Sequence, residues 1–375
     1  MIAVHVVQVD AVTAIGRGVE TLWKALHAGK SGLSPVRRFA TDRYVAHVAG
    51  CIPALDAEHP CSRLDALVDM LSSIADVPDG CHLLTASTKA GIDQLERTVR
   101  GQADRSDRLL GHHVANRVAA HLGLKGPRQN VSAACASATV ALALGASRIA
   151  AGQADAVLVC GLDLISEFIF SGFSSLMALS PTMCRPFDVD RDGLLLGEGA
   201  AYVLLMSDPL RRREGRESLG CLAGWGVSGD AHHITAPSRE GEGLIRAVGQ
   251  ALERAALAPD DIAAISAHGT GSVYNDAMEL KAFGRLFEHR VPFHSVKGAT
   301  GHTMGASGAI ETVIGLWSLR HQCIPPTVGL GTPEPAAGGR VSALPQSIAG
   351  DSLLVTNSGF GGINAAVILA RGGAS

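Results

Sequence analysis

Apolar runs and mixed apolar–polar stretches alternate along the chain and predict an α/β protein. The N-terminal "MIAVHVVQVD" predicts a first strand, and "GVETLWKALHAG" predicts the helix that follows it. "ADAVLVCGLDLI" (154–165) is almost wholly apolar, which is typical of a buried central strand. Later, "GLIRAVGQALERAAL" predicts a helix and "DSLLVTNSGF" a strand. Alternating strands and helices favour an α/β fold with buried sheets.

The polar, arginine-rich segment "SDPLRRREGRES" (207–218) is the clearest change in composition. We place the division between two halves there, giving residues 1–210 and 211–375. A chain of 375 residues is long enough for two core-sized units. Each half also carries a helix followed by an apolar strand that ends in glycine, "ADAVLVCG" in the first and "IAAISAHG" in the second.

Composition and charge exclude several classes of protein. Apolar residues make up 47%, charged residues 18%, and the net charge is −3, so nothing favours a nucleic-acid or membrane-surface partner. We find no uncharged apolar run of about 18 residues and expect no membrane span. The first residues lack the basic region of a signal peptide. Eight cysteines without a CxxC pair favour reduced thiols in a cytoplasm.

Cys135 lies at the start of the Ala-rich stretch "ASATVALALGASRIAAGQ", which predicts a helix. The positive end of a helix dipole and its free N–H groups favour a thiolate, so we expect a lowered pKa. Small neighbours on its N-terminal side would let a substrate approach. Taken alone, Cys135 has a simpler interpretation as a buried core residue, and both interpretations stay open at this point.

Two histidine segments strengthen the catalytic interpretation. "ISAHGTGSVYND" places His268 just after an apolar strand, where α/β enzymes carry functional groups. "KGATGHTMGASGAIE" contains Lys297, His302 and Glu311 among small residues that leave room for a ligand. The glycine-rich "NSGFGGINA" (357–365) could supply backbone N–H groups for half of an oxyanion hole, with the N–H of Cys135 as the other half.

Taken in order, these segments resemble the 3-ketoacyl-ACP synthases, the condensing enzymes of fatty-acid and polyketide synthesis. The resemblance rests on "SAACASAT", "RPFDVDRDGLLLGEGA", "HGTGSVYND", "KGATGHTMGASGAIE" and "NSGFGGINA", and covers nearly the whole chain. It implies a thiolase-like five-layer αβαβα fold with two similar halves. Two histidines imply an elongating synthase that takes acyl-ACP primers. "NSGFGGINA" lacks one aromatic residue of the family's usual "NSFGFGGTN", which puts the acyl specificity in question.

The resemblance also implies a role for each residue. Cys135 would accept the acyl group, and His268 and His302 would bind malonyl-ACP and stabilise the enolate formed by decarboxylation. Lys297 would set the electrostatics of the site with Glu311 as its buried partner. The remaining implied positions are Phe360 as the gate and second oxyanion-hole N–H, and Asp276 and Glu279 as structural acids.

The implied partners are acyl carrier protein (ACP) and a second subunit, in a homodimer or a heterodimer with a related ketosynthase. No metal or organic cofactor is implied, because decarboxylation generates the nucleophile. ACP is acidic, so its docking surface should be basic. The candidates are Arg37 and Arg38 in "PVRRF" and Arg211, Arg212 and Arg213 in "PLRRREGR"; the alternative for both is ordinary solvated surface.

Two other functions remain as alternatives. One is a non-catalytic subunit resembling a chain-length factor, which would lack the nucleophile that this chain has. The other is a thiolase-type acyltransferase, which needs a second reactive cysteine in a glycine-rich C-terminal turn. The last cysteine, Cys323, lies in "RHQCIPPT", which is not such a turn.

Overall fold

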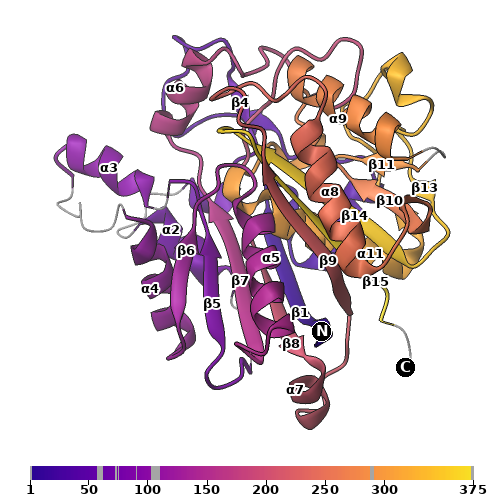
Figure 1. Ribbon diagram of the computed structural model, residues 1–375. Coiled ribbons are helices and arrows are strands. Elements are labelled where there is room, and N and C mark those ends of the chain that lie inside the picture. The colour runs from indigo at the N-terminus through magenta and orange to yellow at the C-terminus, as the bar shows by residue number, and fades with distance from the viewer. Residues whose placement is uncertain are drawn as a thin grey trace.

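One large mixed sheet organises the molecule (Figure 1). The computed structural model describes residues 2–56, 62–71, 74, 76–89, 91–102, 110–287 and 291–372. In spatial order the strands of the first half are β1 (Val4–Thr13), β8 (Gly199–Ser207), β7 (Ala156–Asp163), β5 (His82–Ala86) and β6 (Arg128–Val131). Those of the second half are β9 (Gly220–Gly229), β15 (Ile363–Ala370), β14 (Ser352–Gly359), β10 (Ile262–Ser266) and β11 (Phe293–His294).

The two sets of strands repeat one pattern of direction. In the first, β1, β8 and β7 are successively antiparallel, and β5 and β6 continue parallel to β7. In the second, β9, β15 and β14 are antiparallel, and β10 and β11 continue parallel to β14. The sets meet where β1 pairs antiparallel with β9. The repeated directions agree with the similarity between the two glycine-ended strands in the sequence. The proposed division at residue 210 falls within α7 (Asp208–Arg213), which joins the two sets of strands.

Two helices lie between the halves of the sheet. The core cluster around α5 (Ser137–Ala150) and α11 (Ser307–His321) contains side chains from strands of both halves. On the outside, α2 (Arg63–Asp69) and α4 (Gly111–Leu122) cover the first half, and α8 (Glu242–Ala255) and α9 (Val273–Leu286) cover the second. The layers are therefore helix, sheet, helix, sheet, helix, and the expected five-layer fold with two similar halves is confirmed.

Short elements complete the chain. The remaining helices are α1 (Val19–His27), α3 (Ile92–Val99), α6 (Glu167–Ser175) and α10 (Lys297–Thr300), with 3-10 turns at Pro53–Leu55, Pro259–Asp261, Met304–Ala306 and Pro335–Ala337. β2 (Gly16–Arg17) extends β1, and the pairs β3 (Ser34–Pro35) with β4 (Val48–Ala49) and β12 (Cys323–Ile324) with β13 (Gln346–Ser347) stand apart. None of the helices in the described ranges is both long and apolar enough to cross a bilayer.

The apolar patterns explain where the main elements form. Every residue of β7 is buried, as its continuous apolar run predicts for a strand covered on both faces. Helix α5 is built largely from Ala, so it packs closely against both α11 and the sheet. Gly308 lets the two central helices meet, because a Cβ there would lie 2.0 Å from the Thr139 hydroxyl oxygen. The ends of α5 and α11 near this crossing carry the candidate site.

Candidate active site

Cys135 lies in a tight turn between β6 and α5. Ala134, directly before it, has φ of 48°, a backbone region that non-glycine residues rarely adopt. The Ser137 hydroxyl fixes the turn by accepting the Ala133 N–H at 2.8 Å and donating to the Ala134 carbonyl at 2.6 Å. The turn brings the cysteine to the N-terminus of α5, as expected, with 7% of the residue exposed.

His268 follows β10, on a loop held by two buried carboxylates. Glu279 accepts the N–H groups of His268 and Gly269, both at 2.7 Å. Asp276 accepts the N–H groups of Thr270 at 3.0 Å and Gly271 at 3.2 Å. Both acids lie on α9, so this helix fixes the backbone that carries the histidine.

His302 is positioned by the turn that links α10 to α11. Its N–H donates to the Leu195 carbonyl at 2.7 Å, and its Nδ1 lies 3.2 Å from the Ser307 hydroxyl. The turn is itself anchored across the molecule, since the Asp163 carboxylate on β7 accepts the Gly305 N–H at 2.7 Å. The first half therefore holds the loop of the second half that carries His302.

The structure brings all three candidate catalytic side chains together. One side-chain N or S atom each of Cys135, His268 and His302 lies within 4.8 Å of the others, and the imidazole centroids are 5.2 Å apart. The three line a cavity of about 300 Å³ that opens beside Met177 and Tyr274. Within the described part of the chain, these three residues are also the one cluster whose side chains could together hold a metal ion. An ion there would occupy the sulfur that acyl transfer requires.

Lys297 and Glu311 form a buried ion pair beneath the histidines. Each side chain is 1% exposed, and the lysine also donates to the His268 carbonyl. Asn357 on β14 joins this pair to His268: its Nδ2 donates to Glu311 Oε2 at 2.7 Å and lies 3.1 Å from His268 Nδ1. Thr139 donates to the Asn357 carbonyl oxygen. Asn357 was not among the residues expected from the sequence.

The glycine-rich turn after β14 packs against the cysteine. A Cβ on Gly359 would lie 3.1 Å from both the Cys135 nitrogen and the Ala133 oxygen, so only glycine fits this approach comfortably. Phe360 follows Gly359. Hydrogen bonds from the Phe360 N–H and the Cys135 N–H to the Cys135 sulfur favour its thiolate form. The Phe360 ring stacks on Phe173 with centroids 5.7 Å apart at the cavity wall. The two N–H groups that the sequence predicted for the oxyanion hole therefore lie at the sulfur.

Burial dominates the electrostatics of the site. Loss of water raises the pKa of the Cys135 thiol to about 12, although Lys297 opposes this shift. The expected net lowering of the thiol pKa by the helix N-terminus is thus wrong, because desolvation of the thiolate outweighs the nearby favourable groups. Burial and Lys297 also hold the pKa values of His268 and His302 well below 6.5, so both imidazoles are neutral. Burial, with Asp276, raises the pKa of Glu279 to about 8.

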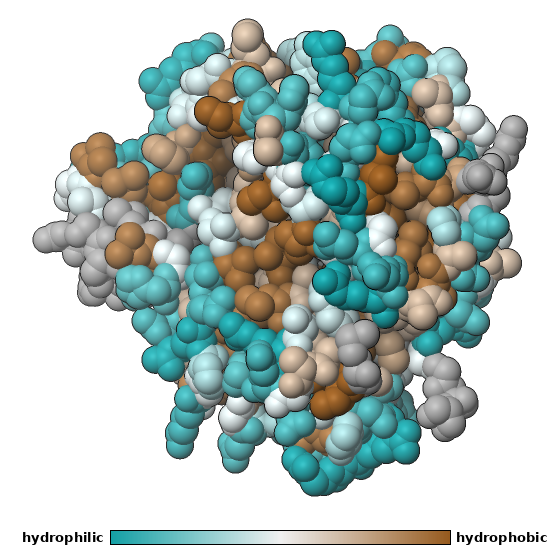
Figure 2. All heavy atoms as spheres, in the orientation of Figure 1, coloured by the Kyte–Doolittle hydropathy of each residue, from teal (hydrophilic) through white to brown (hydrophobic). Residues whose placement is uncertain are grey.

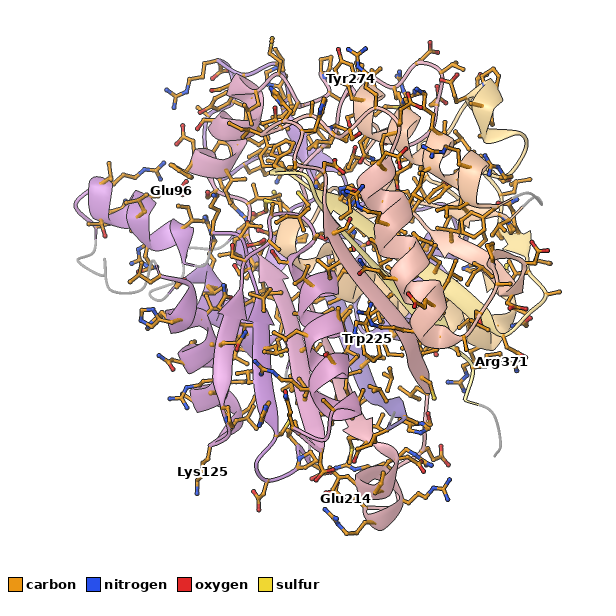
Figure 3. All side chains as sticks on the ribbon, in the orientation of Figure 1. Glu96, Lys125, Glu214, Trp225, Tyr274 and Arg371 are labelled. Carbon is orange, nitrogen blue, oxygen red and sulfur yellow. The ribbon has the colours of Figure 1, made fainter. Side chains whose placement is uncertain are left out.

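The structure does not support most of the basic residues expected to dock a partner. The Arg38 side chain is only 4% exposed and is paired with the buried Glu198 and with Asp56, so it cannot meet another protein. Arg211, Arg212 and Arg213 lie on α7, which follows β8 at the far end of the sheet from the cavity, a strand length of about 25–30 Å. Figure 3 shows this separation between Glu214, at the bottom, and Tyr274, at the top. Arg37 is exposed and remains a candidate.

The fold and the cysteine–histidine site together define a condensing enzyme of the acyltransferase class. Residues 82–209 match the beta-ketoacyl synthase N-terminal domain, and residues 219–331 match the C-terminal domain of the same family. The 3-oxoacyl-[acyl-carrier-protein] synthase 2 of Vibrio cholerae serotype O1 is 30% identical over 95% of this chain and 96% of its own. A Staphylococcus aureus relative of the same name is 30% identical over 96% and 98%. The chain belongs to the beta-ketoacyl synthase family.

Solved structures agree with this membership. "The ishigamide ketosynthase/chain length factor" superposes with a TM-score of 0.89 at 29% identity, covering 99% of this chain and 100% of that one. A beta-ketoacyl synthase from Burkholderia phymatum gives 0.88 at 26%, with 99% and 100% covered. A ketosynthase in complex with its chain length factor from Xenorhabdus doucetiae gives 0.85 at 27%, with 99% and 98% covered. The thiolase-like fold and the assignment as a ketosynthase enzyme are thereby confirmed.

Proposed function

We propose that this chain is an elongating synthase that condenses a Cys135-bound acyl group with malonyl-ACP. The observation that carries the proposal is the convergence of the Cys135 sulfur and one nitrogen each of His268 and His302 within 4.8 Å at the cavity. The Phe360 N–H at the same sulfur supplies the donor that an acyl-transfer site needs.

The first half-reaction loads the enzyme. The Cys135 sulfur attacks the thioester carbonyl of acyl-ACP, whose oxygen gains negative charge and accepts hydrogen bonds from the Cys135 and Phe360 N–H groups. The C–S bond to ACP then breaks, and the proton of the Cys135 thiol ends on the released ACP thiol. Because burial raises the pKa of the Cys135 thiol to about 12, we expect its proton to leave during the attack on the acyl-ACP carbonyl rather than beforehand.

The second half-reaction extends the chain. Malonyl-ACP places its thioester oxygen against His268 and His302, which are neutral and can each donate a hydrogen bond. Carbon dioxide leaves, and the electron pair of the broken C–C bond forms an enolate that these donors stabilise. The enolate carbon attacks the acyl carbonyl, the Cys135 sulfur leaves and takes up one proton, and 3-ketoacyl-ACP is released.

The test is product formation from an acyl-ACP and malonyl-ACP, with carbon dioxide measured in parallel. In the wild type we expect one carbon dioxide for each 3-ketoacyl-ACP formed. In Cys135→Ala we expect this one-to-one ratio to be lost. A non-catalytic subunit would give neither product. A thiolase would condense thioesters without releasing carbon dioxide. It would also need a second cysteine near the site. Cys323 does not meet this need, because it follows the C-terminal end of the 15-residue α11, whereas the N-terminus of that helix faces the cavity.

We further propose that ACP docks on the α6 side of the cavity. Helix α6 runs from the cavity wall at Phe173 to Glu167, where Arg43 (71% exposed) and Arg100 (47% exposed) converge on one carboxylate. These residues line a surface hollow next to α3, which Glu96 marks in Figure 3. Arg43 and Arg100 present exposed guanidinium groups beside exposed apolar Phe168, which suits an acidic, amphipathic partner helix.

A second subunit is proposed at the β6 edge of the first half. Among the strands that the structure describes, β6 forms one edge of the sheet and leads directly into the Cys135 turn, so we propose that its outer side pairs with a strand of another chain. Figure 2 shows apolar side chains gathered at the centre of the face in view, over α5. Either a second copy or a related ketosynthase would cover this face. We infer a cytoplasmic setting, because Cys135 chemistry requires a reduced thiol.

A further inference from the structure

Asn357 is the polar group that connects His268 to the buried ion pair. It lies on β14 and is fully buried, three residues before the gate Phe360. Its amide makes three contacts: Nδ2 with Glu311 Oε2 at 2.7 Å, Nδ2 with His268 Nδ1 at 3.1 Å, and Oδ1 with the Thr139 hydroxyl. All the hydrogen-bonding groups involved lie away from water, so each must be satisfied inside the protein.

Donor and acceptor chemistry fixes which way this amide points. The Glu311 carboxylate is paired with the Lys297 ammonium and can only accept hydrogen bonds. The Asn357 atom 2.7 Å from it must therefore be the NH₂ group, because a carbonyl oxygen there would face a carboxylate oxygen. The second hydrogen of that NH₂ group then points to His268 Nδ1. A nitrogen that accepts a hydrogen bond carries no proton, so the proton of the neutral ring must be on Nε2.

We propose that Asn357 is a positioning residue that holds His268 in the Nε2–H tautomer, so that this imidazole always presents a donor to the substrate cavity. Lys297 pairs with Glu311, and Glu311 accepts from Asn357 and so orients its amide. The oriented amide then donates to His268 Nδ1. The inference deepens the proposed condensing function and rests on it for its catalytic consequence.

His302 differs in this respect. Its Nδ1 faces the Ser307 hydroxyl at 3.2 Å, and that hydroxyl also lies 3.1 Å from the Thr303 hydroxyl. A hydroxyl can donate or accept, so this contact does not select one tautomer. Only His268 is tied to a group whose direction is forced by a charged pair. The two histidines are thus distinguishable in one experiment on one protein.

The direct test is the protonation pattern of the ring nitrogens in the complete protein labelled with ¹⁵N-histidine, using long-range ¹H–¹⁵N correlation. The signals of His268, one of 15 histidines, are assigned by their loss in His268→Gln. We expect a single Nε2–H tautomer in the wild type. Asn357→Ala should convert it to a mixture, whereas Thr139→Val, which removes only the partner of Oδ1, should preserve it. A wild-type His268 with its proton on Nδ1 would overturn the proposal, whether or not the variants fold.

The kinetic test separates positioning from general damage. Malonyl-ACP decarboxylation should fall roughly 10²- to 10³-fold in Asn357→Ala, as for loss of one preorganised donor. Acylation of Cys135 should change less than about threefold, because its N–H donors do not involve His268. An equal fall in both steps would mean a merely structural role. If the wild type itself fails to decarboxylate malonyl-ACP, the proposed function fails, while the tautomer measurement still decides the role of Asn357.

Discussion

Replacing Lys297 by Met would leave the Glu311 carboxylate buried without its counter-ion. Both side chains are 1% exposed, so water cannot take over the role of the ammonium group. Loss of one partner from such a pair costs about 3–5 kcal/mol of unfolding free energy. The matched control is Arg285→Met, which breaks the Arg285–Glu242 pair at 48% and 50% exposure and should cost no more than about 1 kcal/mol.

The double variant Lys297→Met/Glu311→Gln tests the reasoning itself. Glutamine is neutral and can still accept from Asn357, so about 2 kcal/mol of the lost stability should return, and about 1–3 kcal/mol stays lost for the missing hydrogen bonds. Urea unfolding followed by circular dichroism measures all four proteins. The reasoning is refuted if Lys297→Met lowers the free energy of unfolding no more than Arg285→Met does. It is also refuted if the double variant is no more stable than Lys297→Met.

The remaining predictions concern pH, docking and the oxyanion hole. Burial lowers the pKa of His294 to about 3, whereas an unfolded histidine titrates near 6.5; the unfolded state therefore binds the extra proton, and stability falls as pH drops below 6.5. His294→Leu should remove about 2 kcal/mol of that fall between pH 6.5 and 5, measured by urea unfolding; parallel curves would contradict this. Arg43→Glu should raise the Michaelis constant for acyl-ACP but not for small thioesters, whereas Arg212→Glu on α7 should change neither; equal effects of Arg43→Glu on both substrates would exclude docking there. Gly359→Val should slow acylation of Cys135 at least about tenfold in rapid-quench assays, because its side chain must displace the N–H that faces the carbonyl; an unchanged rate would exclude that N–H from the oxyanion hole.

Local patterns were sufficient to predict much of the fold. The apolar run at 154–165 became β7, and the Ala-rich stretch became α5, because burial and helix propensity act over neighbouring residues. The directional repeat of the strands could not be predicted this way, since it depends on which strands pair across the whole chain. The candidate site was found because its motifs carry Cys, His and Gly in distinctive local contexts.

Long-range partners explain what the sequence did not show. Asn357 contacts Thr139, His268 and Glu311, which are 218, 89 and 46 residues away, and its own neighbours give no hint of them. Arg38 has the composition of a surface patch, but Glu198, 160 residues later, pairs with it inside the protein. The Cys135 thiol likewise took its character from burial, which a helix start alone does not reveal.

The central claim is that Cys135 carries the acyl group, and intact-protein mass spectrometry tests it most directly. The protein is incubated with a panel of short, long, unsaturated and aryl acyl-ACPs, with Cys135→Ala as the control. We predict a mass gain equal to one acyl group that is absent in the control, with the best donor defining the primer class. A gain that persists in Cys135→Ala, or no gain with any donor in the presence of a partner ketosynthase subunit, would contradict the account.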